Sequence, residues 1–169
     1  MVNYFGHQLL TSLLMDALGG KLREVVNVSS GLAKNAPLDI AVDILNPDES
    51  KYSAKDMYTL SKLYMDAMAY KIDSDANSPT RALSVYPGFV PNTNLGRDFA
   101  WYERLFTSLM AYMPFATSEQ GAVGYIVNAA LSINQHEKGT VINQKGTWIP
   151  YSQRAKDIAS SSLPSLQSI

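Results

Sequence analysis

Residues 23–31, REVVNVSSG, contain a short run of β-branched side chains that ends in two serines and a glycine. Such a run is typical of a buried strand that leads into a loop. Residues 81–89, RALSVYPGF, form a second run of this kind, and Pro87 and Gly88 stop it. The sequence therefore predicts two strands, each followed at its carboxyl end by hydroxyl-bearing or turn-forming residues.

Helical patterns lie before, between and after these two strands. Residues 3–18 carry apolar side chains at helical spacing, and a pair of glycines follows as a typical stop. The apolar stripe of this segment consists of Phe5, Leu9, Leu10, Leu13, Leu14 and Ala17. A second helix is predicted at about 55–74. A third is predicted from a capping residue at Thr117 or Ser118 through the stretch SEQGAVGYIVNAAL.

The remaining segments complete an alternating order of helices and strands. Residues 89–117 contain two prolines and many large apolar side chains, and we expect a helical excursion there. Residues 139–149, GTVINQKGTWI, predict a last strand, and the polar, Ser-rich tail after it is expected to fray. The alternation predicts an α/β fold with parallel strands and helical crossovers. Sheets of this type place their chemistry at the carboxyl ends of the strands.

The composition is that of a single globular domain. The chain has 169 residues, 46% of them apolar and 17% charged, and this length falls within the range of one domain. A net charge of -1 and scattered lysines and arginines predict no binding to nucleic acid, which needs a basic surface. No apolar run approaches the ~20 residues that a membrane-spanning helix needs, so no such helix is expected.

The inventory of reactive side chains excludes several kinds of site. The sequence has no cysteine, so disulfides, thiolate catalysis and zinc–thiolate sites are ruled out. It has two histidines, His7 and His136, and neither has a partner at ligand spacing. Both are therefore interpreted as structural or exposed residues, and no metal site is expected.

Two chemically active side chains are spaced four residues apart in the second predicted helix. Tyr58 and Lys62 share one face of that helix, within the Met-rich stretch MYTLSKLYMDAM at 57–68. Such a pair on its own is more typical of a solvated face or of a lysine that extends along apolar surface. The paired serines after the first strand, Ser29 and Ser30, are on their own typical of turns. The order of these features along the chain decides their interpretation.

Taken in order, the motifs resemble those of the short-chain dehydrogenase/reductase family. The matching pieces are VNYFGHQLLTSLL, VVNVSSG, YTLSK, YPGFVPNT and SEQGA, and they span roughly residues 2–131. Tyr-x-x-x-Lys alone is a weak motif, but it becomes specific with a Val-Asn-Val-Ser-Ser strand before it and a Pro-Gly strand after it. VNYFGH and YPGFVPNTNLGR look most like the retinol-dehydrogenase-like and protochlorophyllide-reductase-like branches of that family.

The resemblance implies a catalytic role for four residues. Tyr58 would donate and accept the proton at the substrate oxygen, and Lys62 would lower the pKa of Tyr58 while holding the nicotinamide ribose. Ser30 would form a hydrogen bond to the same substrate oxygen, with Ser29 as its substitute. Asn3, at the start of the first helix, would complete a proton relay through a water molecule, although its residue type is also compatible with a helix cap.

The resemblance also implies where a cofactor, NAD or NADP, would lie. Pro87, Gly88 and Thr93 match the loop that meets the nicotinamide carboxamide, and this loop is one residue longer before Thr93 than the usual spacing. The large apolar side chains of residues 99–115 match a segment that covers the substrate pocket in this family. Their composition is equally typical of a hydrophobic core, and the sequence leaves both interpretations open.

The family's glycine-rich dinucleotide-binding turn is missing from the sequence. Gly19 and Gly20 do not replace it, because they end a helix instead of joining a strand to a helix N-terminus. We therefore expect a partial Rossmann-type parallel sheet with flanking helices, without its N-terminal dinucleotide-binding half. Residues 1–150 would be the catalytic half and 151–169 a tail. Such a chain should bind NAD or NADP weakly, and its strand at 24–29 should leave a sheet edge open for self-association.

The leading hypothesis is an NAD(P)-dependent oxidoreductase that interconverts a carbonyl and an alcohol on an apolar small molecule. The alternative is a non-catalytic interaction module derived from the same fold, which would use its open sheet edge to bind a partner. A serine hydrolase based on Ser29 or Ser30 is disfavoured, because the sequence has no G-x-S-x-G motif and neither histidine is recognisable as its base.

Overall fold

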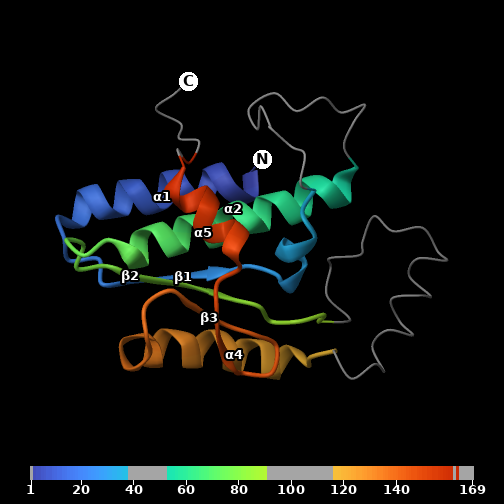
Figure 1. Cartoon of the computed structure of the whole chain (residues 1–169). Coiled ribbons are helices and arrows are strands. Elements are labelled where there is room, and N and C mark those ends of the chain that lie inside the picture. The colour runs from blue at the N-terminus through green and yellow to red at the C-terminus, as the bar shows by residue number, and fades with distance from the viewer. Residues whose placement is uncertain (1, 38–52, 91–115, 162, 164–169) are drawn as a thin grey trace.

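The computed structural model describes residues 2–37, 53–90, 116–161 and 163, and this part of the chain has three layers (Figure 1). A four-stranded sheet lies in the middle. Three helices, labelled α1, α2 and α5, lie on one side of the sheet, and α4 covers the other side. The α/β architecture that the alternating pattern predicts is therefore confirmed.

The sheet has the order β1-β2-β3-β4. β1 (Glu24–Val28) and β2 (Arg81–Val85) are the two strands predicted from the β-branched runs, and they pair in parallel along their whole length. β3 (Thr140–Ile142) is parallel to β2, and β4 (Trp148–Pro150) is antiparallel to β3. In the described part of the chain β1 pairs with β2 alone, so its outer edge is open.

The prediction of one strand over residues 139–149 is wrong, because this segment turns back on itself as a hairpin between β3 and β4. The side-chain oxygen of Asn143 accepts hydrogen bonds from the backbone N–H groups of Lys145 and Thr147, at 2.9 and 3.1 Å. Gly146 occupies the left-handed region with φ +70°, which favours glycine. The sheet is therefore mixed, with one antiparallel strand at its edge.

The two faces of the parallel strands pack against different helices. Val25 and Ala82, which are register partners, pack in the cluster on the α2 side of the sheet. Val26, Leu83 and Val85 pack in the cluster on the α4 side. Because side chains alternate along a strand, this assignment fixes which residues of β1 and β2 face α2.

α2 (Ala54–Ser74) is the central helix of the fold and confirms the helix predicted at 55–74. A capping box defines its start: the Ser53 hydroxyl accepts from the backbone N–H of Asp56, and the Asp56 carboxylate accepts from the N–H of Ser53, both at 3.1 Å. The helix contacts β1, β2, α1 and α5. This cap therefore sets the positions of Tyr58 and Lys62 along the helix.

α4 (Glu119–Ser132) begins at the predicted cap Ser118, whose hydroxyl accepts a hydrogen bond from the backbone N–H of Gly121 at 3.1 Å. A side chain at Gly121 would be crowded, because its Cβ would lie 3.1 Å from the Thr117 methyl carbon. The helix continues into a short 3-10 helix, η3 (Ile133–Gln135). The capping residue predicted from the sequence therefore marks the observed start of α4.

α1 (Val2–Leu18) forms the predicted helix, but most of its apolar stripe is not buried by the described residues. Phe5 is buried and packs beside Tyr4 and Met68. Four leucines of the stripe remain 40–57% exposed: Leu9, Leu10, Leu13 and Leu14. The helical period was predicted correctly, whereas burial depends on packing partners that the period does not specify.

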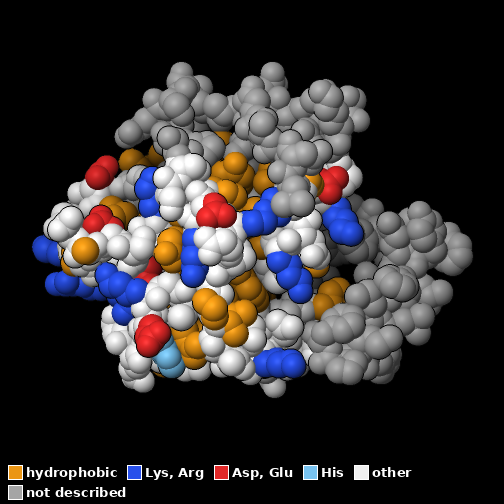
Figure 2. Space-filling view, in the orientation of Figure 1, with side chains coloured by type: hydrophobic (Ala, Val, Ile, Leu, Met, Phe, Trp, Pro, Cys, Tyr) orange, Lys and Arg blue, Asp and Glu red, His pale blue; other side chains and the backbone are white. Residues whose placement is uncertain are grey.

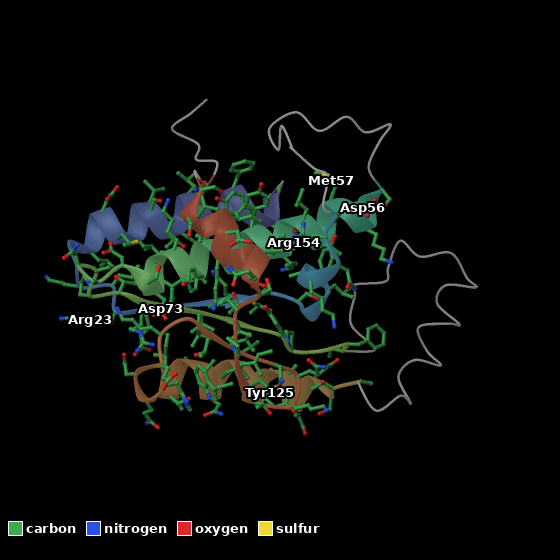
Figure 3. All side chains as sticks on the ribbon, viewed as in Figure 1. Arg23, Asp56, Met57, Asp73, Tyr125 and Arg154 are labelled. Atoms are coloured by element: carbon green, nitrogen blue, oxygen red, sulfur yellow. The ribbon has the colours of Figure 1, made fainter. Side chains whose placement is uncertain are left out.

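The expectation that the tail frays is wrong for part of it, because α5 (Gln153–Ser160) packs against α2. Ala155 of this helix is fully buried. Arg154 (labelled in Figure 3) donates hydrogen bonds at 2.5 and 2.7 Å to two backbone carbonyls just after the 3-10 helix η1 (Gly31–Asn35). Small buried side chains and one arginine therefore hold this segment despite its polar composition.

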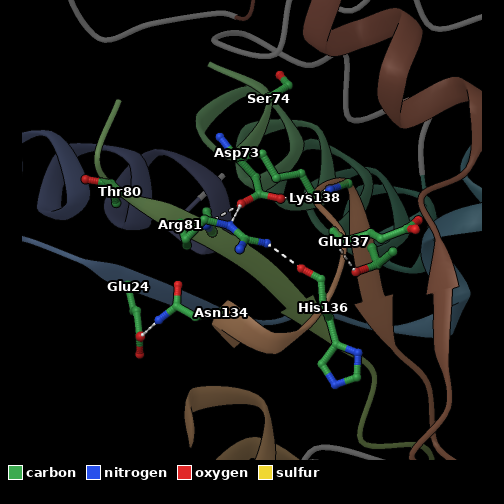
Figure 4. A network of polar contacts seen from close by, with 12 residues as sticks. Glu24, Asp73, Ser74, Thr80, Arg81, Asn134, His136, Glu137 and Lys138 are labelled. Atoms are coloured by element: carbon green, nitrogen blue, oxygen red, sulfur yellow. Dashed lines mark hydrogen bonds and ion pairs between the residues drawn. The ribbon is translucent and has the colours of Figure 1, made fainter. Parts of the chain in front are cut away.

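A polar network joins the C-terminal end of α2 to the amino ends of the strands (Figure 4). One carboxylate oxygen of Asp73 accepts from Arg81 Nε at 2.7 Å and from the N–H of Ala82 at 3.1 Å, and the other accepts from the N–H of Gly139 at 2.8 Å. A second guanidinium nitrogen of Arg81 donates to the carbonyl of His136 at 3.2 Å. The buried charge of Asp73 is thus paired and fully hydrogen-bonded.

The surface shows charges of both signs among apolar side chains. On the face in Figure 2, Lys and Arg side chains alternate with acidic and hydrophobic ones over α2 and α5, and no single basic field covers it. Within the described ranges no helix combines the length and the hydropathy needed to cross a bilayer.

Candidate active site

The N-terminal half of α2 lies toward the end of the sheet at which β1 and β2 stop (Figure 1). Figure 3 shows Asp56 and Met57 in the first turn of this helix and Asp73 near its other end. Tyr58 follows Met57 directly and Lys62 comes one helical turn later, so both belong to the half of α2 at the carboxyl ends of the strands. This is the edge of the sheet at which the fold class predicts chemistry.

Lys62 is anchored at the end of β1. Its ammonium group donates a hydrogen bond to the backbone carbonyl of Val28 at 2.9 Å, and it lies 3.7 Å from the sulfur of Met65. Burial lowers the pKa of this ammonium, and the nearby charge of Asp66 raises it in part. A lysine that merely extended over the surface would leave its charge in water, so this contact supports a positioned cation.

Tyr58 lies beside this cation. The Lys62 nitrogen is 5.7 Å from the centroid of the Tyr58 ring, within the range of a cation–π contact. The tyrosine is half-buried. The backbone carbonyl of Tyr58 accepts a hydrogen bond from the Ser61 hydroxyl at 2.7 Å. The two side chains that the motif pairs are therefore neighbours in space at the end of β1.

The two serines after β1 have different environments. Ser29 is buried, and its hydroxyl donates to the backbone carbonyl of Lys62 at 3.2 Å, which ties the end of β1 to α2. Ser30 is half-buried, and its hydroxyl accepts from the N–H of Leu32 at 3.2 Å as the cap of η1. An oxygen that accepts one hydrogen bond can still donate its own proton to a ligand. Ser30 is accordingly the more accessible of the two candidates.

The Pro-Gly loop follows β2 at the same edge of the sheet. Gly88 is exposed and has φ +84°, a conformation that an L side chain rarely adopts. Phe89 forms an isolated parallel bridge with Ala116, and its carbonyl accepts from the N–H of Thr117 at 2.8 Å. The loop therefore starts at Pro87 and is pinned two residues later, beside the segment that leads into α4.

Two further residues that the resemblance singles out are less informative. Asn3 is exposed in the first turn of α1, the helix that packs on α2, and its role in a proton relay stays a prediction. Thr93 lies outside the described residues, as does the segment 99–115 with its two open interpretations. The described geometry thus brings Ser29, Tyr58 and Lys62 to one place.

Sequence reasoning missed a buried acid in this region. Asp66 lies one turn after Lys62 on α2, is 1% exposed, and accepts a hydrogen bond from the Tyr86 hydroxyl at 2.6 Å. Burial raises the pKa of its carboxyl to about 6, against the lowering effects of Tyr86, Ser29, Ser84 and Lys62. The available signal was its spacing, because an acid four residues after Lys62 shares that residue's helix face.

The two histidines have no ligand-like environment. The ring of His136 stacks on Trp148 with centroids 3.7 Å apart, and its backbone carbonyl belongs to the Arg81 network. His7 is exposed on α1. Within the described ranges no cluster of three or more His, Asp or Glu side chains could hold a metal ion.

A cavity of about 610 Å³ lies on the α4 side of the sheet, away from Lys62. It opens between the start of α4 and the turn that joins β3 to β4, with Tyr125 and Lys145 among its lining residues. Figure 3 shows Tyr125 on α4, below the sheet in that view, whereas α2 lies above it. This cavity is therefore separate from the group formed by Tyr58 and Lys62.

Two of the curated proteins that match this chain are named as dehydrogenases. The chain is 33% identical to human polyprenol dehydrogenase over 129 residues, which cover 72% of this chain and 38% of that protein. It is 31% identical to mouse retinol dehydrogenase 13 over 114 residues, which cover 64% of this chain and 32% of that protein. No family model matches the sequence. These likenesses support a relationship to the short-chain dehydrogenase/reductase family.

A solved structure shows the same fold. The crystal structure of an uncharacterized protein from Mycobacterium paratuberculosis matches with a TM-score of 0.59 at 22% sequence identity, over 94% of this chain and 53% of the other. At this identity the match speaks for the fold alone. The chain spans about a third of the length of the curated relatives described above.

Proposed function

We propose that this chain carries the proton-transfer and nicotinamide-facing half of an NAD(P)-dependent oxidoreductase of the short-chain dehydrogenase/reductase family. The reaction would interconvert a carbonyl and an alcohol on an apolar small molecule. The observation that carries the proposal is the Lys62 ammonium, held 2.9 Å from the Val28 carbonyl at the end of β1 and beside the Tyr58 ring. Relatives named as dehydrogenases support the same reaction class.

In this proposal Tyr58 exchanges a proton with the substrate oxygen. A phenol is a poor acid near neutral pH, since its ordinary pKa is about 10. In the mechanism that the family resemblance implies, a cation beside the tyrosine assists this proton transfer, and the Lys62 ammonium lies 5.7 Å from the centroid of the Tyr58 ring. The contact of Lys62 with a backbone carbonyl holds the charge in place without neutralising it.

The two serines after β1 have different proposed roles. Ser30, whose hydroxyl is accessible and can donate, would hold the substrate oxygen near Tyr58. Ser29 would act through structure, because its hydroxyl fixes the end of β1 to the carbonyl of Lys62. Asn3 would extend the proton relay from the start of α1, as the family resemblance implies.

The described residues fit the nicotinamide end of a dinucleotide. Lys62 and Tyr58 provide polar groups for the ribose, and the exposed Gly88, with its positive φ, lets the backbone approach a planar amide closely. Thr93 belongs to the same proposed loop. A bound dinucleotide would supply or accept the hydride. The sequence has no glycine-rich turn between a strand and a helix, so we expect this chain alone to bind NAD or NADP weakly.

The proposed substrate class rests on the names of the relatives. They are named for polyprenol and retinol, which are apolar alcohols. We therefore propose an apolar aldehyde or alcohol as substrate, with its oxygen at Tyr58 and its apolar part directed away from the charges.

The test uses a chimera, because the chain matches only part of its relatives. The matched 129-residue segment of human polyprenol dehydrogenase is replaced by this chain, and NADH- and NADPH-dependent reduction of polyprenal and retinal is measured. Tyr58→Phe should lower kcat at least about a hundredfold, since general acid catalysis contributes at least that much. Tyr64→Phe, on the same helix, is the matched control and should retain activity.

Two outcomes would count against the proposal. A folded chimera without any reductase activity would remove its basis, provided that circular dichroism shows native helix content. A chimera that is active but insensitive to Tyr58→Phe would show that another group transfers the proton.

A second candidate function is favoured by the open edge of β1 and by the exposed leucines of α1. Both features are typical of surfaces that associate. In this case the chain would be a non-catalytic interaction module or would bind a second copy of itself through the sheet edge. Size-exclusion chromatography with light scattering distinguishes a monomer from an assembly, and an inactive chimera together with a stable complex would favour this alternative.

A further inference from the structure

A polar group lies buried between α2 and the sheet, and the proposed proton transfer does not use it. Its centre is Asp66, which is 1% exposed and accepts a hydrogen bond from the Tyr86 hydroxyl at 2.6 Å. Asn27 and Ser84 are register partners on β1 and β2 and alternate with residues that face α4, so both face α2. The acid therefore sits against the two strands whose ends form the candidate site.

Tyr86 connects this acid to the proposed cofactor loop. It directly precedes Pro87 and Gly88, and its backbone N–H donates to the carbonyl of Ile142 on β3 at 2.7 Å. Tyr86 is thus fixed by two hydrogen bonds, one from its backbone to β3 and one from its hydroxyl to α2. The hydroxyl contact joins the helix that carries Tyr58 and Lys62 to the loop that would meet the nicotinamide.

Within the described part of the chain the coordination of Asp66 is incomplete by hydrogen-bond geometry, although Ser29 and Ser84 lie close enough to lower the pKa of its carboxyl. Its Oδ1 atom, the Ser84 hydroxyl and the Asn27 side-chain nitrogen are buried, and none has a partner with hydrogen-bond geometry in the described part of the chain. A purely structural acid is normally fully satisfied, because each unpaired buried polar group costs stability. Incomplete pairing next to a candidate site is a reason to look for a functional role.

We propose that Asp66 is a positioning residue, which holds the Pro87–Gly88 loop at a fixed place relative to Lys62 through the Tyr86 hydroxyl and favours the Lys62 ammonium by its charge. This inference rests on the proposed function. Asp66 does not touch the reacting atoms; it acts through Tyr86 and Lys62. The alternative is that Asp66 is a buried aspartate that only stabilises the fold.

The electrostatics of the group agree with this role. The charge of Asp66 raises the pKa of Lys62 against the effect of burial, so a neutral Asp66 leaves the ammonium less favoured. Among the residues that the structure describes, the titratable groups that face Asp66 are Lys62, Tyr86 and Tyr151. Burial raises the pKa of both tyrosines far above neutrality, so they stay protonated. Asp66, with a pKa of about 6, is the member of the group that changes charge near neutral pH.

The first arm of the test measures loop position without activity. In the 169-residue chain, amide hydrogen exchange is followed at Tyr86, bonded to Ile142, and at Thr117, bonded to Phe89. Asp66→Asn and Tyr86→Phe should each speed exchange at these two amides about tenfold and leave the amides of β1 unchanged. Unchanged exchange, or an equal rise throughout the chain, would overturn the proposal.

The second arm uses the active chimera and separates cofactor binding from chemistry. Tyr86→Phe should raise KM for NADPH or NADH about tenfold with little change in kcat, as expected for a lost ground-state contact. Asp66→Asn should do the same and also remove the rise in kcat/KM centred near pH 6. Asp73→Asn is the matched control, because it alters a buried aspartate of the same helix far from the loop and should leave KM and the pH profile unchanged.

The two hypotheses fail differently. If the parent chimera is inactive, the proposed function is wrong, and the role of Asp66 in that reaction falls with it. If the parent chimera is active but Asp66→Asn leaves both KM and the pH profile as they were, the proposed function stands and the role of Asp66 is wrong. A change of equal size in Asp73→Asn would assign the effect to general destabilisation and would also overturn the inference.

Discussion

Two buried aspartates on α2 show how differently the two ends of this helix are built. Asp66 and Asp73 are each 1% exposed and are two turns apart. Asp73 accepts three hydrogen bonds, one of them from the guanidinium of Arg81, and both of its carboxylate oxygens are occupied (Figure 4). Asp66 accepts one geometrically complete hydrogen bond, from the Tyr86 hydroxyl, and its second oxygen has no such partner among the described residues.

The difference separates a structural clamp from a residue placed for another purpose. The Asp73 network joins the end of α2, the start of β2 and the turn before β3, and it lies at the amino ends of the strands, where this fold class places no chemistry. The Asp66 group lies toward the carboxyl ends, beside Lys62 and the Pro87–Gly88 loop. Full pairing favours stability, whereas a carboxyl with a pKa of about 6 keeps the capacity to change charge near neutral pH.

The largest effect on stability is expected at Asp73. Asp73→Ala leaves the half-buried Arg81 guanidinium and two backbone N–H groups without their acceptor. Breaking a buried ion pair by removing one partner typically costs about 3–5 kcal/mol. Urea denaturation of the chain at pH 7.5 measures this loss. A change below about 1 kcal/mol would show that the network does not clamp the helix.

The next largest effect is expected from Asp66→Asn, with the opposite sign. The pKa of Asp66 is about 6 in the folded chain and 3.8 as its ordinary value, so the folded chain binds more protons between these pH values. Its stability therefore falls as pH rises from about 4 to above 6, by on the order of 3 kcal/mol. Asparagine cannot ionise, so the variant should be the more stable protein at pH 7.5 and should lose this pH dependence.

The pH dependence of Asp66→Asn is read as a difference from the parent chain, because exposed carboxylates also titrate in this range. Urea midpoints at pH 4, 5, 6 and 7.5 provide the comparison. Equal slopes for parent and variant would mean that Asp66 ionises normally, and the contrast with Asp73 would lose its physical basis.

Tyr86→Phe should have an intermediate effect. It removes the one geometrically complete hydrogen bond that Asp66 accepts within the described ranges, and it leaves a buried carboxylate without this donor. A hydrogen bond to a charged group contributes about 1.5–3 kcal/mol, so stability at pH 7.5 should fall by about 2 kcal/mol. In the Asp66→Asn background Tyr86→Phe should cost less stability than it does in the parent chain, because no charge is then left without its donor. An equal cost in both backgrounds would indicate that the two side chains do not interact.

Ser84→Ala should have the smallest effect. The Ser84 hydroxyl is buried without a geometrically complete hydrogen bond in the described part of the chain, and the backbone N–H of Ser84 donates to Tyr151 independently of the side chain. Removing a hydroxyl whose hydrogen-bond geometry is incomplete should change the free energy of unfolding by less than about 0.5 kcal/mol. Thermal denaturation measures this, and a loss above about 1.5 kcal/mol would mean that the hydroxyl supports Asp66 more strongly than its geometry shows.

Features of the fold that depend on nearby residues could be predicted from the sequence. The β-branched runs give β1 and β2, and the capping residue Ser118 defines where α4 begins. Features that depend on distant partners could not. α5 looks like a polar tail until Ala155 is seen buried against α2, and the leucines of α1 have the period of a buried face without being covered.

The same distinction between local and distant contacts applies to the candidate site. The spacing of Tyr58 and Lys62 follows from helix geometry, and their order relative to Ser29 and Ser30 indicates a common edge of the sheet. The sequence does not indicate that Ser29 bonds the carbonyl of Lys62, because these residues are 33 positions apart. It also gives no sign that Asp66 is buried and bonded to Tyr86, since that contact forms only when α2 packs on β2.

The most direct test of the central claim follows the hydride itself. The chimera described above is incubated with an apolar aldehyde and with NADPH or NADH that carries deuterium at the transferring C4 position, and the product alcohol is analysed by mass spectrometry. We predict one deuterium per product molecule, and with Tyr58→Phe labelled alcohol should form at least about a hundred times more slowly than with the parent chain, while Tyr64→Phe retains the parent rate. A folded parent chimera that yields no labelled alcohol, or an equal rate of labelled alcohol formation with Tyr58→Phe, would contradict the account.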